Sequence, residues 1–350
     1  MSEVSLPRAG GANFDASAQR ARFGGELASV TPITDAVSAS EKPRGAQRLD
    51  IRNPRDVQTA AKILVAGEDP LFARFGNILG VFGHPSAETV GNINEFKGRP
   101  RSQTGSVTTS SEHYESLADW EHLDGGLLVP NADVRLNKET ALTLIDALSK
   151  EGPVGVLLPA ADHIPGHLSR TEQNANGELR TVQLIVPGQN CPSTEVFSAA
   201  VNQLPDMPII FATSGNMSKT VMKSEQPAHY DYDPLVREFT EQGKGDITVI
   251  TDSEEEEHKV RGRHRYHDQR STTILRLDDV VREEDGAPKI DKNGRPILKV
   301  QRHGSMHAVY LRDILAEHGF GIQFPPEESR VPIRTDASTE VVSFVNPAQK

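Results

Sequence analysis

Apolar residues recur at helical spacing in some stretches of the chain and in short runs in others. After Asn53-Pro54, a helix start signal, apolar residues repeat at helical spacing over 57–65, and again over 141–148. Two further helices are predicted at 195–204 and 235–239. Short apolar runs bounded by turn residues predict buried strands at 78–82, 127–129, 154–158, 182–186, 209–211 and 247–250. Residues 67–77 are expected to form a loop.

A hairpin is predicted within residues 288–301, because Asn293-Gly294 is the strongest short hairpin signal in the chain. Helices and strands therefore alternate, but hairpins interrupt the alternation. This pattern indicates an α/β domain with a twisted mixed sheet, parallel and antiparallel, flanked by helices, and not a doubly wound parallel sheet.

Composition suggests where the domain begins and ends. Residues 1–50 are rich in Ala, Gly, Ser and charged residues without sustained periodicity, which predicts a flexible N-terminal extension. Residues 51–325 hold the periodic segments and are expected to form a single domain with loop insertions. Residues 326–350 are expected to be a C-terminal tail that crosses the surface.

The bulk charge and apolar pattern narrow the class of protein. A formal net charge of −11 argues against a strong nucleic-acid surface, because neutralising phosphates requires a concentrated basic surface. No apolar run approaches eighteen residues and no charged-then-apolar leader is visible, so we expect a cytoplasmic protein without a membrane span. The single cysteine, Cys191, excludes an internal disulfide, and no ligand spacing predicts a metal site.

A local basic patch at residues 261–267 follows an acidic run at 254–257. A solvated loop whose charges partly cancel is the favoured interpretation. The alternative is a lid whose arginines close over bound phosphates.

Two polar clusters are the strongest candidates for chemistry. The turn Thr213-Ser214-Gly215-Asn216 directly follows a predicted strand, so it places hydroxyl and amide groups at a strand end. Upstream, Lys97-Gly98-Arg99-Pro100-Arg101 gathers three cations beside a Gly and a Pro that are expected to keep the backbone extended. Each is ordinary alone; together they describe a polyphosphate site.

These clusters and their surroundings resemble the YrdC-like threonylcarbamoyl-adenylate synthases. Lys97-Gly-Arg99-Pro is similar to the family's Lys-x-Arg motif, and Thr213-Ser-Gly-Asn216 to its Thr-Ser-Ala-Asn turn. The matches follow in the family's order over roughly residues 55–310. Residues 85–91 correspond to a loop of the family. The remaining matches are at 152–159, 181–188, 271–275 and 300–304. The resemblance implies a single YrdC-like domain, without the additional C-terminal domain of longer members.

The resemblance also implies a reaction. L-Threonine and bicarbonate would form a carbamate that attacks the α-phosphorus of ATP and expels pyrophosphate, giving L-threonylcarbamoyl-adenylate for tRNA threonylcarbamoyladenosine (t6A) modification. Mg²⁺ is expected as the ion that accompanies ATP, bound mainly through phosphates and water. Proteins of tRNA modification are possible partners.

The resemblance assigns roles to ten residues. Lys97 and Arg99 would hold phosphates and offset the repulsion between two anions, while Arg101 would hold a carboxylate or another phosphate oxygen. Thr89 would face the amino-acid end. The other nucleotide or phosphate contacts would come from Ser214, Asn216, Ser271, Thr272, Thr273 and Arg302.

Two departures leave alternatives open. Ile185 stands where the family carries a strand arginine, and Val90 where it carries a loop tyrosine. These changes suggest that ATP binding is retained while recognition of the acyl substrate has changed. One alternative is therefore a divergent carbamoyl-adenylate-forming enzyme acting on another amine or on carbamoyl phosphate. Another is a nucleotide- or RNA-binding module without turnover.

Overall fold

A computed structural model describes residues 46–76, 78–126, 135–174, 177–188, 191–223, 228–252 and 271–326. The chain divides into two units, Met1–Lys42 and Pro43–Lys350, and every described residue belongs to the second. Several predicted features lie outside the described residues: the extension up to residue 45, the strand at 127–129, the basic patch at 261–267 and the tail from residue 327.

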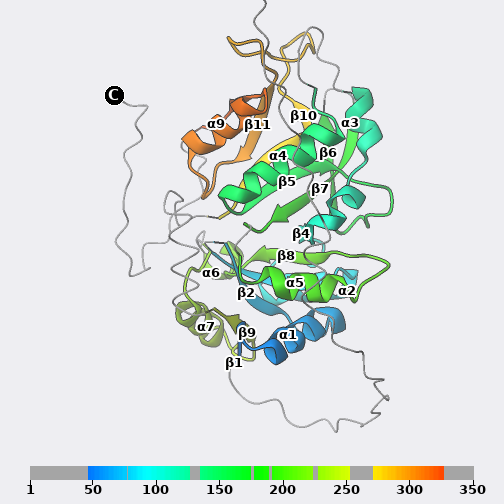
Figure 1. The fold of residues 1–350 in the computed structure, drawn as a ribbon. Coiled ribbons are helices and arrows are strands. Elements are labelled where there is room, and N and C mark those ends of the chain that lie inside the picture. The colour runs from blue at the N-terminus through cyan, green and yellow to red at the C-terminus, as the bar shows by residue number, and fades with distance from the viewer. Residues whose placement is uncertain are drawn as a thin grey trace, which may run out of the picture. The chain divides into compact units, whose positions relative to one another are not determined.

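Within the described residues, twelve strands form one mixed sheet in the order β1-β9-β2-β3-β8-β4-β7-β5-β10-β11-β12, with β6 paired to β7 (Figure 1). Parallel pairs such as β5–β10 and β4–β7 stand beside antiparallel pairs such as β5–β7 and β3–β8. The predicted mixed α/β class is confirmed. The strands are β1 (Gln47–Asp50), β2 (Leu71–Phe75), β3 (Ile78–Gly83), β4 (Ser106–Thr108), β5 (Val154–Pro159), β6 (Ser169–Asn174), β7 (Gly177–Val186), β8 (Ile210–Ser214), β9 (Thr248–Thr251), β10 (Thr273–Val280), β11 (Ile297–Arg302) and β12 (Gly321–Gln323).

The predicted helices form where their start and stop signals stand. Helix α1 begins after Asn53, whose side chain accepts a hydrogen bond from Arg55 N, and ends at Gly67 with φ +71°. The helices are α1 (Pro54–Ala66), α2 (Ala87–Phe96), η2 (Ser111–Leu117), α3 (Trp120–Gly126), α4 (Lys138–Glu151), α5 (Thr194–Val201), α6 (Lys219–Met222), α7 (Tyr232–Glu241) and α9 (Ala308–Glu317).

One hydrophobic cluster lies between helices α1 and α5 and the strands β2, β3, β8 and β9; we call it the α1–α5 core. Its centre is aromatic, since the ring centroid of Phe197 on α5 lies 4.6 Å from that of Phe82 and 5.8 Å from that of Phe75. Ile185, from strand β7 inside the sheet, also belongs to this core. Burial of such rings is among the strongest stabilising terms in a fold of this size.

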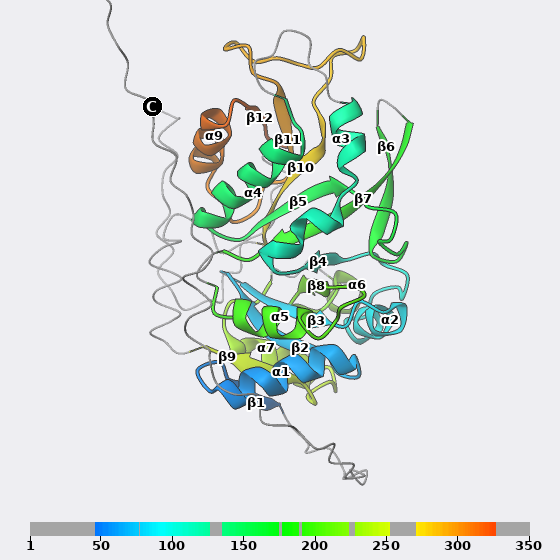
Figure 2. The same ribbon diagram turned by 45° about the vertical axis from the view of Figure 1, so that its right-hand side comes forward.

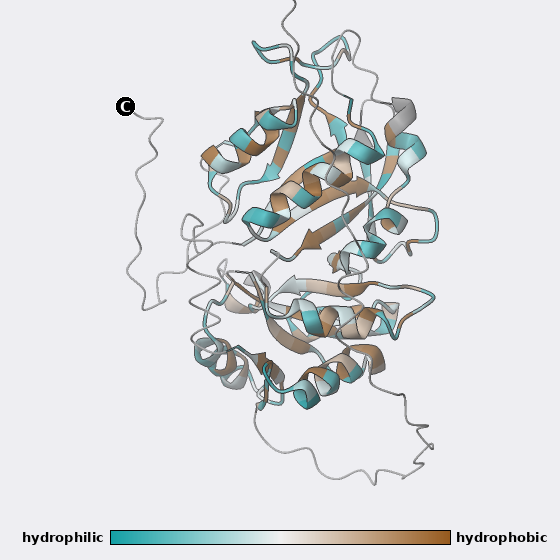
Figure 3. Ribbon diagram, viewed as in Figure 1, coloured by the Kyte–Doolittle hydropathy of each residue, from teal (hydrophilic) through white to brown (hydrophobic). Residues whose placement is uncertain are grey.

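The larger cluster lies against the other side of the sheet. Along β7, Val182, Leu184 and Val186 contribute to this cluster, whereas Gln183 and Ile185 do not, as the two-residue period of a strand requires. Helices α4 and α9 bury their apolar stripes here, and Figure 3 shows the apolar runs along β5 and β7 next to α4. The opposite side of β7 is therefore free to carry polar groups.

The loop predicted at residues 67–77 is wrong, because β2 occupies Leu71–Phe75 and pairs antiparallel with β3. Arg74 interrupts the apolar pattern of this strand, yet it is buried. Its Nε donates to Asp252 Oδ2 at 2.6 Å, and its guanidinium lies 5.4 Å from the ring centroids of Tyr230 and Tyr232. The partner that makes this burial possible lies 178 residues away.

The expected extended backbone at Lys97–Arg101 is also wrong, as is a loop throughout residues 85–91. Helix α2 begins after Ser86, whose hydroxyl accepts from Thr89 N, and Lys97 is its C-cap residue. Gly98 follows with φ +71°, the left-handed conformation that ends many helices. The Gly and the Pro therefore mark the end of a helix.

The hairpin predicted at residues 288–301 is partly confirmed. A turn forms at Asn293-Gly294, where Gly294 N donates to Asp291 O at 3.0 Å and Gly294 has φ +80°. The segment before the turn makes only single bridges, and β11 pairs instead with β10 and β12.

Candidate functional site

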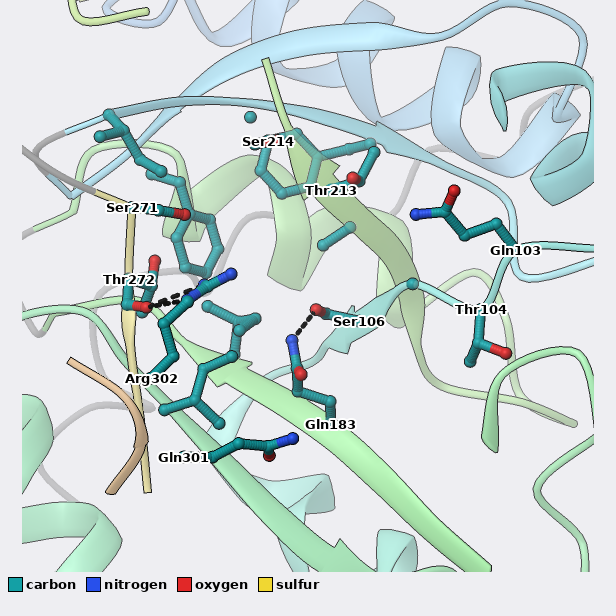
Figure 4. A pocket seen from close by; sticks show the side chains of 18 of the residues that line it. Gln103, Thr104, Ser106, Gln183, Thr213, Ser214, Ser271, Thr272, Gln301 and Arg302 are labelled. Carbon is teal, nitrogen blue, oxygen red and sulfur yellow. Dashed lines mark hydrogen bonds between the residues drawn. The ribbon is translucent and has the colours of Figure 1, made fainter. Parts of the chain in front are cut away.

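A cavity of about 430 Å³ opens where the α1–α5 core stops and the polar side of β4, β7, β10 and β11 begins (Figure 4). Three arginines line it, together with six hydroxyl and three amide side chains. Its apolar wall comes from Phe75, Ile78, Phe82, Ile185, Ala212 and Ile274. The polar lining residues are Arg99, Arg170, Arg302, Thr104, Ser106, Thr213, Ser214, Ser271, Thr272, Gln103, Gln183 and Gln301.

The charge of this lining has one sign. In the part of the chain that the structure describes, no Asp or Glu lines the cavity, whereas three guanidinium groups do. Guanidinium groups with hydroxyl and amide donors are well suited to phosphate or carboxylate oxygens. The lining is therefore chemically complementary to an anion, and its apolar wall to an apolar group.

The structure brings together five of the residues predicted from the sequence: Arg99, Ser214, Ser271, Thr272 and Arg302. Arg302 Nε and Nη2 donate to Thr272 O at 3.0 and 2.8 Å, as Figure 4 shows. Arg99 Nη1 donates to Thr213 Oγ1 at 2.7 Å. The chain therefore positions two of the three arginines through its own oxygens before any ligand binds.

Lys97 lies directly behind the cavity and is fully buried. Its ammonium donates to Ser214 O and approaches Thr213 Oγ1 at 3.3 Å. Burial lowers the pKa of Lys97 well below its usual value, the Arg99 charge lowers it further, and the Glu238 carboxylate opposes the shift. Burial also lowers the pKa of Arg99.

Asn216 and Thr273 are buried beside the cavity and do not line it. The Asn216 amide donates to Met217 O at 3.0 Å. The Thr273 hydroxyl accepts from Gly304 N at 3.1 Å and from Met306 N at 3.0 Å. In these contacts both side chains hold neighbouring backbone in place.

Thr89 and Arg101 lie apart from the cavity lining. The Thr89 hydroxyl donates to Gly67 O at 2.8 Å, at the first turn of α2. Arg101 is half-exposed, and its Nη1 lies 2.5 Å from Glu95 Oε2. Neither side chain contributes to the surface that an occupant of this cavity would meet.

Seven polar lining residues were given no individual role from the sequence: Gln103, Thr104, Ser106, Arg170, Gln183, Thr213 and Gln301. A usable signal existed for Gln183, because it interrupts the apolar run 182–186 at a position that alternates away from the core. Its Nε2 donates to Ser106 Oγ across the β4–β7 pair. The others are separated in sequence and meet only through the order of the strands.

A buried network fixes the turn after β8. Met217 N donates to Glu238 Oε1 at 2.8 Å, and the other oxygen of that carboxylate lies 2.8 Å from His229 Nε2. From the other side, Ser218 N donates to Lys97 O at 3.0 Å. Helices α2 and α7 therefore hold the turn between them.

Among the described residues, no group of three or more His, Cys, Asp or Glu side chains is arranged to hold a metal ion. The described helices include none that is both long and apolar enough to span a membrane.

Comparison with known proteins gives a match at the level of structure alone. No family model and no curated protein matches the sequence. A structure of a doubly substituted variant of Sua5 from P. abyssi superposes with a TM-score of 0.51 at 16% identity, over 80% of this chain and 66% of that one. The chain has a YrdC-like fold. The fold predicted from the sequence motifs is therefore confirmed.

Two further structures give lower scores. A Sua5 structure from P. abyssi in complex with L-threonine has a TM-score of 0.47 at 16% identity, over 79% of this chain and 62% of that one. A hypothetical protein, smu.1377c, from Streptococcus mutans UA159 has a TM-score of 0.49 at 13% identity, over 80% and 98% of the two chains. The chain with the YrdC-like fold spans less than two thirds of the length of either Sua5 chain.

Proposed function

We propose that this chain forms L-threonylcarbamoyl-adenylate from L-threonine, bicarbonate and ATP, with release of pyrophosphate, and that the product serves t6A modification of tRNA. The observation that carries the proposal is the cavity itself: three arginines and no carboxylate among the described lining residues, on a YrdC-like fold. Such a lining favours a highly anionic substrate, and ATP with a carbamate is one.

In the proposed reaction, the amino nitrogen of threonine attacks the carbon of bicarbonate, and water leaves to give a carbamate. A carbamate oxygen then attacks the α-phosphorus, and the bond from that phosphorus to the bridging oxygen of pyrophosphate breaks. The main barrier is the approach of two anions, so positive charge fixed in advance is the chief contribution that the protein can make. Arg99 and Arg302 are the cavity cations already held in place.

The hydroxyls of Thr213, Ser214 and Thr272 lie beside these arginines and would donate to phosphate oxygens. Lys97, held against Ser214, would strengthen the positive potential from behind. No carboxylate is among the described lining residues, so Mg²⁺ would be held mainly by phosphate oxygens and water, with the hydroxyl and amide oxygens of the lining as its protein ligands. The apolar wall around Phe75 and Ile274 would pack against the base.

A second candidate is the same adenylate chemistry on a different amine or on carbamoyl phosphate. The observation that favours it is Ile185, which lines the cavity as an apolar side chain where the sequence resemblance leads one to expect a cation. A changed wall at this point would alter the acyl substrate more than the nucleotide.

The test is pyrophosphate release from ATP with Mg²⁺ and bicarbonate, with each amino acid supplied separately and the nucleotide product identified by mass. Release with threonine and a threonylcarbamoyl-adenylate mass supports the first candidate. Release with another amine, or with carbamoyl phosphate alone, supports the second. ATP binding without release under any condition contradicts both and indicates a nucleotide-binding module.

Variants complete the test. Arg302→Gln should abolish release, whereas Arg312→Gln should not, because Arg312 is half-exposed on α9 and pairs with Asp313. Equal activity of the two variants would place the reaction outside this cavity.

A further inference from the structure

Arg170 differs from the other two arginines of the cavity. Arg99 donates to Thr213 and Arg302 to Thr272, so the chain already engages both. The Arg170 guanidinium lines the same cavity, and in the described part of the chain no hydrogen bond or ion pair engages it. A guanidinium at a cavity wall can bind a ligand when its N–H donors make no contact with the described protein residues.

The sheet places Arg170 at a different end of the cavity from Arg302. Strand β6 pairs with residues 177–182 of β7, and β4 pairs with the same strand at Leu184 (Figure 2). Arg302 belongs to β11, which is separated from β7 by β5 and β10. At about 4.8 Å between strands, the β6 and β11 backbones are roughly 19 Å apart.

The lining divides accordingly. In Figure 4, Gln103 and Thr104 lie on the side opposite Ser271, Thr272 and Arg302, with Ser106 and Gln183 between the two groups. Strands β4 and β7 are parallel and Val107 pairs with Leu184, so the residues just before β4 lie near Val182 of β7. Val182 in turn pairs with Ser169 on β6, the neighbour of Arg170. Arg170 therefore belongs with Gln103 and Thr104.

This second end suits a second, smaller anion. The sequence offered Arg101 for a carboxylate, but Arg101 lies outside the lining and pairs with Glu95. Ile185 supplies no charge. If Arg99 and Arg302 bind the phosphates, as the proposed function has it, Arg170 is the lining cation that remains for a second anionic group.

We propose that Arg170, with Gln103 and Thr104, forms a subsite for the α-carboxylate of the acyl substrate, so that the substrate class is free α-amino acids. This inference rests on the proposed function, since it assigns the opposite end of the cavity to ATP. A guanidinium that binds the carboxylate through two parallel hydrogen bonds selects amino acids over simple amines, amino-acid amides and carbamoyl phosphate. Arg170 then determines substrate specificity, and the phosphate contacts are made elsewhere.

The experiment compares two ligands on four proteins by calorimetry, with the full chain and the non-hydrolysable ATP analogue AMPPNP present. The ligands are L-threonine and L-threoninamide, which lacks the carboxylate. If another amino acid proves best in pyrophosphate release, that amino acid and its amide replace them. The proteins are the wild type, Arg170→Gln, Arg170→Lys and the surface control Arg312→Gln. Because both ligands meet every variant, differences intrinsic to the ligands cancel.

The wild type and Arg312→Gln should bind the acid about 10- to 100-fold more tightly than the amide, as expected for a charge-assisted bidentate contact. Arg170→Gln should bring this ratio close to one, and Arg170→Lys should give an intermediate ratio. The affinity for the ATP analogue should change less than about threefold in either variant.

Three results would overturn the subsite: a wild type that does not distinguish acid from amide, a wild type that binds neither, or an Arg170→Gln variant that keeps the full ratio. If Arg170→Gln fails to fold, a full ratio in Arg170→Lys does the same. Pyrophosphate release by the wild type is scored separately, so the proposed function can stand while the subsite fails, and the subsite can stand on binding alone.

Discussion

The two halves of the sheet are covered differently. Around β2, β3 and β8, apolar side chains pack on both faces: the α1–α5 core on one, and on the other Phe72 of β2, whose ring centroid lies 5.0 Å from that of Phe239 on α7. Around β7, β5 and β10, the described helices α4 and α9 pack against the larger cluster on one face. The other face carries Gln183 and lines the cavity.

This difference shows how, among the described residues, one face of the sheet itself forms the wall of a site. A sheet face that loses its helical cover exposes every second residue of its strands to whatever fills the space. Among the helices that the structure describes, the cover on this face ends at β8, and the polar turn after that strand lies at the boundary. The cavity is therefore a consequence of where the α1–α5 layer stops.

The largest expected effect is a loss of ATP affinity when the cavity arginines are replaced. Replacing Arg99 and Arg302 together by Gln should weaken ATP binding by more than about 100-fold, because each charge-assisted contact contributes about 1.5–3 kcal/mol. The unfolding temperature should change little. Equilibrium binding of ATP and thermal unfolding of the same samples check this, with Arg312→Gln as the control. Loss of less than about threefold would remove the nucleotide from this cavity.

Adjacent residues of β7 test the comparison directly. Leu184→Gln buries an amide beneath the helices and should cost about 3–5 kcal/mol of unfolding free energy. Ile185→Gln places the same side chain at the cavity wall, where water can reach it, and should cost about 1–2 kcal/mol. Denaturant titration of the two variants measures both. Equal losses of unfolding free energy would show that water is excluded equally from both faces of β7.

Lys97→Met should change how stability depends on pH. Burial lowers the pKa of Lys97 in the folded protein, so between that lowered pKa and the usual value of 10.5 the unfolded chain binds more protons and wild-type stability rises with pH. Methionine cannot titrate. The stability of the variant minus that of the wild type should therefore fall as the pH rises toward 10.5, by at most about 1.4 kcal/mol per unit. If the stability of the two proteins depends on pH in the same way, the pKa of Lys97 is not lowered by folding.

Glu238→Gln should give the smallest effect. Glutamine can still accept from Met217 N, but it no longer presents a negative charge toward Lys97. We expect ATP affinity to change by about two- to fivefold, and the free energy of unfolding to fall by about 1 kcal/mol. Glu241→Gln, at the exposed end of the same helix, is the matched control for both measurements. A response no larger than that of the control would show that the carboxylate charge is dispensable.

Local signals predicted much of the fold and only part of the site. Asn53-Pro54 and Gly67 set α1 correctly, because caps act through neighbouring backbone. The strand at Leu71–Phe75 was missed because the burial of Arg74 depends on Asp252, far along the chain. The three cations predicted as one cluster do not share one site, because helix α2 ends among them. Arg99 lines the cavity, Lys97 is buried behind it, and Arg101 pairs with Glu95 outside it. Arg170 reaches the cavity only through strand order.

The different engagement of Arg302 and Arg170 affects how much binding free energy each end of the cavity can supply. Ordering a free arginine side chain costs up to about 2 kcal/mol of conformational entropy. The bonds from Arg302 to Thr272 O mean that folding has already met most of this cost at one end of the cavity. At the Arg170 end the ligand itself must meet it. An otherwise equal contact should therefore contribute less binding free energy at the Arg170 end than at the Arg302 end.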